Sequence, residues 1–188
     1  MKNINTITST TFAILGREDL ALSCANLNSE SELNAEQKLA KTCFNLVAKR
    51  VAEQRLLCTK TERVVAKDGK VVFSDFSVLP HKIIRATDPT SGESVGFKIY
   101  QNNIKFGFCG PVDVEFAFVP ADVEYGQSIS GFDRISDQTM AIGVAAQYLL
   151  CTLSFEEAKL WEARFEEALD EERFLSSQRK EVRSTWNV

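Results

Sequence analysis

Residues 136–175 of this chain read SDQTMAIGVAAQYLLCTLSFEEAKLWEARFEEALDEERFL, and this stretch says most about the fold. Its first part, residues 136–153, is apolar on nearly every side, which predicts a helix that is buried all round. A corner at residues 152–154 then leads into a second helix, which is amphipathic, acidic and predicted to end near Leu175. The sequence therefore predicts a packed pair of helices in this part of the chain.

Small and acidic residues indicate how this helical pair is built. Gly143 lies in a run of small side chains, which would let a neighbouring element approach the first helix closely. Ser136 is placed to cap the first helix. Glu156 and Glu157 fall in the first turn of the second helix, where negative charge interacts favourably with the helix dipole.

The N-terminal third also carries helical signals. Residues 9–26 predict a first short helix, with Gly16 as a weak point. A stronger helix begins after Asn34, because Asn34 and Gln37 have the spacing of a capping box. Apolar residues then recur at helical spacing as far as about Leu57: Ala40, Cys43, Phe44, Val47 and Val51.

The middle third alternates with a period of two, which predicts strands. Asp68-Gly69 favours a type I′ hairpin turn, and a hairpin centred there would place Val65 opposite Val72. A second hairpin is predicted around Asn102-Asn103, with Ile99 opposite Phe106. Further strands are predicted over residues 78–86 and 112–118, the latter ended by Pro120.

These signals together predict an α+β fold, in which a helical bundle of N- and C-terminal helices accompanies a segregated antiparallel β-hairpin and sheet region. The chain has 188 residues, which suits a single domain. We expect that domain to cover residues 1–175, followed by a C-terminal tail over residues 176–188 that becomes ordered on a partner.

Charge is segregated along the chain although the formal net charge is only −4. Residues 38–70 carry nine basic against three acidic side chains, whereas residues 152–172 carry eight acidic against two basic ones. Such zones would let the basic face of one copy meet the acidic face of another, although ordinary solvated surface gives the same pattern.

Five cysteines, odd in number and without the spacing of a zinc site, indicate free thiols in a reducing, cytosolic setting. The first residues lack the apolar core of a signal peptide. The most apolar run, residues 140–150, is shorter than the roughly 20 residues that cross a bilayer. We therefore expect a soluble protein that neither spans a membrane nor is exported by a signal of its own.

The residue types that carry chemistry form no recognisable site. His81 is the one histidine, and no motif places it beside a nucleophile and an orienting carboxylate. Asp113 and Glu115 point the same way from one strand, which could seat a metal but is also the usual polar face of an antiparallel strand. These acids would also repel a phosphate backbone. We expect no catalytic residues, no metal, no cofactor and no sequence-specific nucleic-acid binding.

The order of these features can be compared with known families. It comprises an N-terminal helix over residues 39–57, a strand entered through Leu79-Pro80, a hairpin of FKIY and IKF, a strand ending FAFVP, a helix MAIGVAAQYL and a longer helix ending FEEAL. In this order, and over most of its length, the chain resembles the head–tail connector (adaptor) proteins of tailed bacteriophages. These are ring proteins beneath the portal and include the tail tubular A type.

The resemblance implies a structural, non-enzymatic protein of the virion neck, made in the host bacterial cytoplasm. It implies a ring of about twelve copies that binds the portal on one side and a tail or stopper protein on the other. DNA would pass through the ring during ejection. Two alternatives stay open: another neck or tail protein, such as a stopper or a tail terminator, or a small ligand-binding module or enzyme of unrecognised type.

Two sets of candidate site residues follow from this hypothesis. The portal-binding set mixes apolar and basic side chains in the C-terminal segment: Phe174, Leu175, Arg179, Lys180, Arg183 and Trp186. The lumen-lining set is acidic, because an acidic wall would let DNA slide without gripping it: Asp113, Glu115, Glu156 and Glu157.

Overall fold

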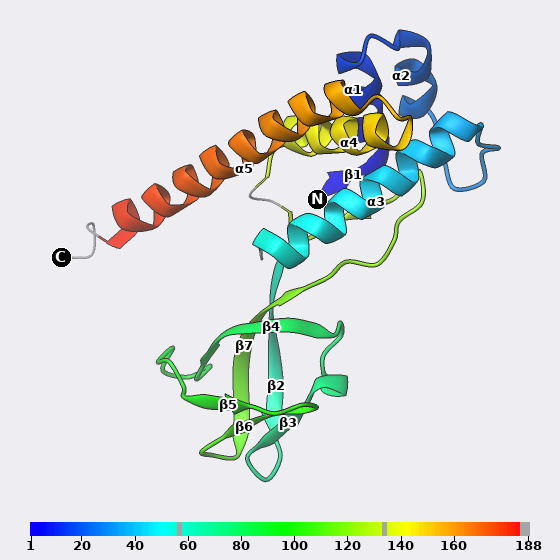
Figure 1. Ribbon diagram of the computed structural model, residues 1–188. Helices are drawn as coiled ribbons and strands as arrows, with labels where there is room; N and C mark the ends of the chain where they lie inside the picture. Colours follow the sequence, from blue (N-terminus) through cyan, green and yellow to red (C-terminus); the bar gives the residue numbers. More distant parts are fainter. Residues whose placement is uncertain (56–57, 133–134, 185–188) are drawn as a thin grey trace. The chain divides into compact units, whose positions relative to one another are not determined.

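A computed structural model describes residues 1–55, 58–132 and 135–184 of the chain, without the side chains at 55 and 173–184. Within these ranges the fold is mixed α/β, with five α-helices and three small antiparallel sheets (Figure 1). The chain divides into two compact units, Met1–Ala48 with Asp122–Val188, and Lys49–Ala121. This division is finer than the single domain over residues 1–175 that the sequence predicts.

The first unit, called here the helical unit, contains most of the helical residues. Its elements are α1 (Ile4–Ile14), α2 (Glu18–Ala25), most of α3 (Ala35–Arg55), α4 (Asp137–Cys151) and α5 (Phe155–Ser184), with the short strands β1 (Lys2–Asn3) and β8 (Ser128–Ile129) paired antiparallel. Helix α4 packs against both α1 and α5. The core of the helical unit includes fully buried aromatic residues: Phe12, Phe44, Tyr125, Phe132 and Phe165.

The predicted first helix over residues 9–26 is wrong in its extent, because the structure has two helices there. Helix α1 already begins at Ile4, where the Asn3 side chain accepts hydrogen bonds from the amides of Asn5 and Thr6. It ends because Gly16 adopts a left-handed backbone with φ of 72°, a conformation that suits glycine. The chain then restarts as α2 at Glu18.

Helix α3 begins as predicted. The Asn34 side chain accepts from the Gln37 amide at 2.8 Å, and the Gln37 side chain accepts from the Asn34 amide at 2.9 Å, which is a complete capping box. Its predicted apolar stripe is buried. Near the middle of α3, Asn45 exchanges two hydrogen bonds with the backbone of Val123, at 3.0 and 3.2 Å, and so ties the helix to the returning chain.

The helical pair α4–α5 is confirmed, with one correction at its end. Ser136 caps α4, which is buried along most of its length, and Leu153 turns the corner with φ of 63°. A Cβ built on Gly143 would lie 2.6 Å from Cε2 of Phe165, so the absent side chain is what admits this ring. Helix α5 runs on to Ser184, past the end predicted near Leu175.

The second unit, called here the β unit, contains two three-stranded antiparallel sheets. One has the order β2 (Thr59–Ala66), β7 (Gly110–Phe118), β4 (Pro80–Thr87), and the other has the order β3 (Lys70–Val72), β6 (Asn103–Phe106), β5 (Phe97–Ile99). The predicted strand over residues 112–118 is the central strand β7, and its apolar residues Val112, Val114 and Phe116 are fully buried.

The first predicted hairpin has the right turn and the wrong strand partners. Asp68 and Gly69 both have positive φ, 51° and 70°, and Lys67 and Lys70 exchange backbone hydrogen bonds at 2.9 Å across them. The strands then separate, since β2 pairs with β7 and β3 pairs with β6. Val65 and Val72 were predicted to face each other, but Val65 lies opposite Pro111 and Val72 lies opposite Asn103. Both valine side chains are about half exposed.

The second predicted hairpin exists with a shifted register. Tyr100 and Asn103 close the turn, so its central residues are 101 and 102, and Ile99 lies opposite Ile104 rather than Phe106. A shift of two residues on the partner strand keeps every side chain on its predicted face. The inward and outward pattern of β5 and β6 was therefore predictable although the pairing was not.

Candidate functional site

The two acidic residues of β7 lie on the polar face of the β2–β7–β4 sheet, each beside an arginine of a neighbouring strand. Arg63 on β2 donates to both carboxylate oxygens of Asp113, at 2.8 and 2.9 Å. Arg85 on β4 lies 3.0 Å from the carboxylate of Glu115. Registers Arg63↔Asp113 and Arg85↔Glu115 bring the partners directly opposite one another.

This pairing changes the chemistry expected of the acidic pair. The pKa of Asp113 is lowered from its ordinary value, mainly by the hydrogen bonds from Arg63. Partial desolvation raises this pKa, and the positive charge of Arg63 lowers it further. Asp113 therefore stays ionised and paired at neutral pH. A carboxylate that accepts two guanidinium hydrogen bonds has less capacity for a metal ion, and this supports the ordinary polar-face interpretation.

A second polar cluster lies at the β2 edge of the same unit. Lys60 lies 2.6 Å from the Glu62 carboxylate, and Ser77 donates to it through both its amide, at 2.9 Å, and its hydroxyl. Desolvation would raise the pKa of Glu62, but these hydrogen bonds and the charge of Lys60 outweigh it, so the pKa is lowered. The cluster joins strand β2 to the segment that follows the short 3-10 helix Phe73–Asp75.

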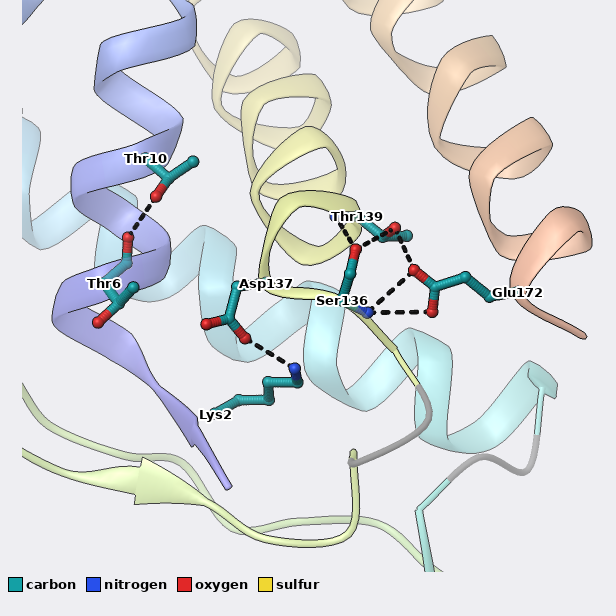
Figure 2. Close-up of polar contacts among 7 residues, drawn as sticks. All are labelled: Lys2, Thr6, Thr10, Ser136, Asp137, Thr139 and Glu172. Carbon is teal, nitrogen blue, oxygen red and sulfur yellow. Dashed lines mark hydrogen bonds and ion pairs between the residues drawn. The ribbon is translucent and has the colours of Figure 1, made fainter. Parts of the chain in front are cut away.

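At the start of α4, the helical unit holds a polar cluster that the sequence did not indicate (Figure 2). Glu172 of α5 accepts the Ser136 amide at 2.9 and 3.0 Å and the Thr139 hydroxyl at 2.6 Å. Lys2 of β1 forms an ion pair with Asp137 at 2.7 Å. These contacts fix α5 and β1 to the first turn of α4, so Glu172 has a structural role and is not part of a free acidic surface.

The remaining acidic candidates lie at the start of α5. Glu156 and Glu157 are both exposed, and Lys159 lies 3.0 Å from the Glu156 carboxylate. Since this pair is in solvent, it only weakly alters the local charge. The four lumen-lining candidates therefore lie on two different elements, α5 and β7, which belong to different units.

The portal-binding candidates belong to the C-terminal segment, residues 174–186. Phe174, Leu175, Arg179, Lys180 and Arg183 fall within the backbone bounds of α5, but their side chains lie outside the described part of the chain. Trp186 lies wholly outside the described residues. Their predicted role at a portal stays a prediction.

Among the described residues, His81, Tyr125 and Cys24 are side chains of types that can act as a base or a nucleophile. His81 is exposed at an irregularity of β4, where the register shifts between Pro80 and Lys82. Tyr125 is buried and donates to the Gln37 carbonyl at 3.0 Å, and burial is the main cause of a raised pKa at both Tyr125 and Cys24. Neither group ionises at neutral pH, so this buried cluster stabilises the core.

The described ranges, residues 1–55, 58–132 and 135–184, bear on two remaining site types, a metal site and a membrane span. They contain no cluster of three or more His, Cys, Asp or Glu side chains arranged to hold a metal ion. None of their helices is long and apolar enough to cross a membrane. Comparison with protein families and with curated proteins gave no match to the chain.

Sequence reasoning missed Arg63 because it predicted the wrong neighbour for β2, and it missed Arg85 because it assigned no neighbour to the strand over residues 78–86. Arg63 was counted within a basic zone, although its side chain neutralises an acid across the sheet. One signal for these partners was available in the sequence. The alternation of residues 112–118 places Asp113 and Glu115 on the polar face of the strand, where a basic side chain of a neighbouring strand can lie opposite each of them. Only the strand order identifies which residue that is.

Proposed function

We propose that this chain is a structural virion protein, a head–tail adaptor that forms a ring between the portal and the tail of a bacteriophage and through which DNA passes. The observation that carries the proposal is a group of exposed apolar side chains around the α4–α5 corner. Leu150, Leu153 and Phe155 are 47%, 72% and 51% exposed. Large apolar groups gathered on a surface favour burial against another protein.

Assembly of copies into a ring is supported by the same corner and by the charge zones. A closed ring uses one surface of each copy against a different surface of the next. The corner supplies an apolar contact, while the acidic α5 and the basic residues of α3 supply charge complementarity. We propose a ring of about twelve copies, by analogy with the family that the sequence resembles.

Within this proposal the helices form a bundle that carries the ring contacts, and the β unit is the segregated antiparallel β-hairpin and sheet region. The C-terminal segment, residues 176–188, contacts the portal, and the opposite side of the ring contacts a tail or stopper protein. The lumen is lined by Glu156 and Glu157. Asp113 and Glu115 are the weaker lumen candidates, because Arg63 and Arg85 neutralise them.

The experiment uses a pair of leucines with equal exposure. Leu153 and Leu79 are each 72% exposed, on the α4–α5 corner and in the β unit respectively. Leu153→Asn removes the apolar side chain at a position of positive φ that asparagine tolerates well, so folding should be retained. Leu79→Asn is the matched control.

Ring formation is measured by native mass spectrometry and negative-stain microscopy, with the purified chain alone and with the portal protein of the same phage. We expect closed rings for the unaltered chain with portal present, at least a tenfold loss of rings for Leu153→Asn, and no loss for Leu79→Asn. Monomers under all conditions, with portal added, would contradict the adaptor proposal. Equal losses for both variants would remove the corner as the contact surface.

A further inference from the structure

Four lysines form a continuous row across adjacent backbone segments of the β unit, called here the lysine row. Lys67 and Lys70 are directly opposite one another across the Asp68-Gly69 turn. Lys70 of β3 is opposite Lys105 of β6. Lys105 is in turn opposite Lys98 of β5. Partners in an antiparallel register point to the same face of the sheet, so all four side chains share one face.

The lysine row is exposed and uncompensated. All four residues are exposed, and no ion pair among the described residues involves any of them. The next row on the same face is uncharged, with Val72 opposite Asn103 and Tyr100 closing the turn beside it. The nearest acid along the chain is Asp68, one carboxylate in the turn itself.

Such a row is unfavourable for folding. Like charges directly opposite one another destabilise a sheet, and here three successive pairs are lysine with lysine. The neighbouring sheet of the same unit does the reverse, since it places Arg63 against Asp113 and Arg85 against Glu115. One sheet is thus neutralised across its strands while the other concentrates positive charge, which points to an anionic partner for the second.

The spacing of the row favours a partner with uniformly dense charge. Neighbouring strands lie roughly 4.8 Å apart, so the row spans roughly 14 Å. Double-stranded DNA carries one negative charge per roughly 1.7 Å of axis, or about eight over that length, enough to meet every lysine from one side. The acidic helix α5 of a second copy fits less well, because Leu160, Ala163 and Arg164 interrupt its acidic positions.

We infer that the lysine row binds the phosphate backbone of a nucleic acid without reading its sequence. Lysine ammonium groups act as point charges toward phosphates, and contacts to the backbone carry no base information. The inference does not depend on the adaptor function, because it concerns the β unit alone and would hold for any protein that meets DNA in this way. In an adaptor it would give the DNA a contact outside the acidic lining.

The test measures binding of the full chain to a fluorescein-labelled duplex of about 20 base pairs by anisotropy, as salt is varied. Four phosphate contacts give a slope of log K against log salt of about −3.6, so affinity should fall about 150-fold between 50 and 200 mM salt. Lys98→Gln with Lys105→Gln should halve the slope, so that affinity falls only about twelvefold. Lys98→Arg with Lys105→Arg should keep the full slope, since charge is retained.

Lys159→Gln, at an exposed lysine of α5, is the matched control and should leave the slope unchanged. Circular dichroism should show every variant folded, because the glutamine changes remove repulsion between facing lysines and all the substituted lysines are exposed. A wild-type slope in the glutamine double variant would overturn the inference. So would binding of poly-glutamate in preference to the duplex, which would assign the row to an acidic protein. Portal-dependent ring formation should survive the double variant, so the two proposals can fail separately.

Discussion

Replacing Gly143 by alanine should destabilise the helical unit, and the structure sets the size of the effect. The added Cβ would lie 2.6 and 2.7 Å from Cε2 and Cζ of Phe165, distances at which atoms overlap. Phe165 is fully buried, so its ring has no room to turn away. Overpacking of a core costs roughly 1–3 kcal/mol, and overlap with several ring atoms puts this site at the upper end.

Helix propensity opposes this cost. Alanine is better than glycine in a helix interior by about 1 kcal/mol, so the net loss should be about 2 kcal/mol. For a chain of this size that corresponds to a fall in the midpoint of thermal unfolding of roughly 4–8 °C. Guanidinium unfolding followed by tryptophan fluorescence measures this loss of stability, because Trp161 lies in α5 of the helical unit.

Two further variants make the reasoning refutable. Gly96→Ala in the β unit is the control, because an added Cβ there meets nothing within 4 Å, and stability should change by less than about 0.5 kcal/mol. The double variant Gly143→Ala with Phe165→Leu should lose less stability than the two single variants together. The difference in the free energy of unfolding should be at least about 1 kcal/mol. Gly143→Ala as stable as the natural chain, or strict additivity in the double variant, would refute the steric argument.

Two other predictions follow from the electrostatics. Because Arg63 lowers the folded-state pKa of Asp113, this pair stabilises the β unit above the ordinary aspartate pKa, and the contribution is lost as pH falls through the lowered value. In NMR titration, Arg63→Gln should raise the Asp113 pKa, and an unchanged midpoint would show that the arginine is not the cause. Burial, reinforced by Cys151, raises the pKa of the Cys43 thiol to about 12. At pH 8 iodoacetamide should therefore alkylate the exposed Cys109 and Cys151 well before Cys43, as read by peptide mass spectrometry, and preferential labelling of Cys43 would contradict the packing of α3.

Local signals in the sequence predicted local structure well. The capping box of Asn34 and Gln37, the cap at Ser136 and the turn at Asp68-Gly69 each depend on residues within a few positions of one another. In each case a side chain or an allowed φ value alone determines the geometry. The apolar alternation of strand 112–118 likewise predicted a half-buried strand.

Contacts between distant segments were not predictable in the same way. Strand β2 leaves its own hairpin to pair with β7, about fifty residues on, and no nearby residue indicates that choice. The ion pairs of Asp113 and Glu115, the capping of α4 by Glu172 and the lysine row all depend on such pairings. Sequence reasoning therefore identified the acidic candidates but not their partners, and it left Lys98 and Lys105 outside the basic zone.

The chain leaves the helical unit after Ala48 and returns to it at Asp122. Two hydrogen bonds between Asn45 and the backbone of Val123 join the two strands of chain near this point. The helical unit is thus assembled from two separate stretches of chain, whereas the β unit is made in one run. During synthesis, the ribosome completes the β unit first, and the N-terminal helices must wait for α4 and α5 before their shared core can close. The chain could be cut and rejoined at the same point: a short linker in place of residues 49–121 would retain all five helices, with α3 shortened to end at Ala48.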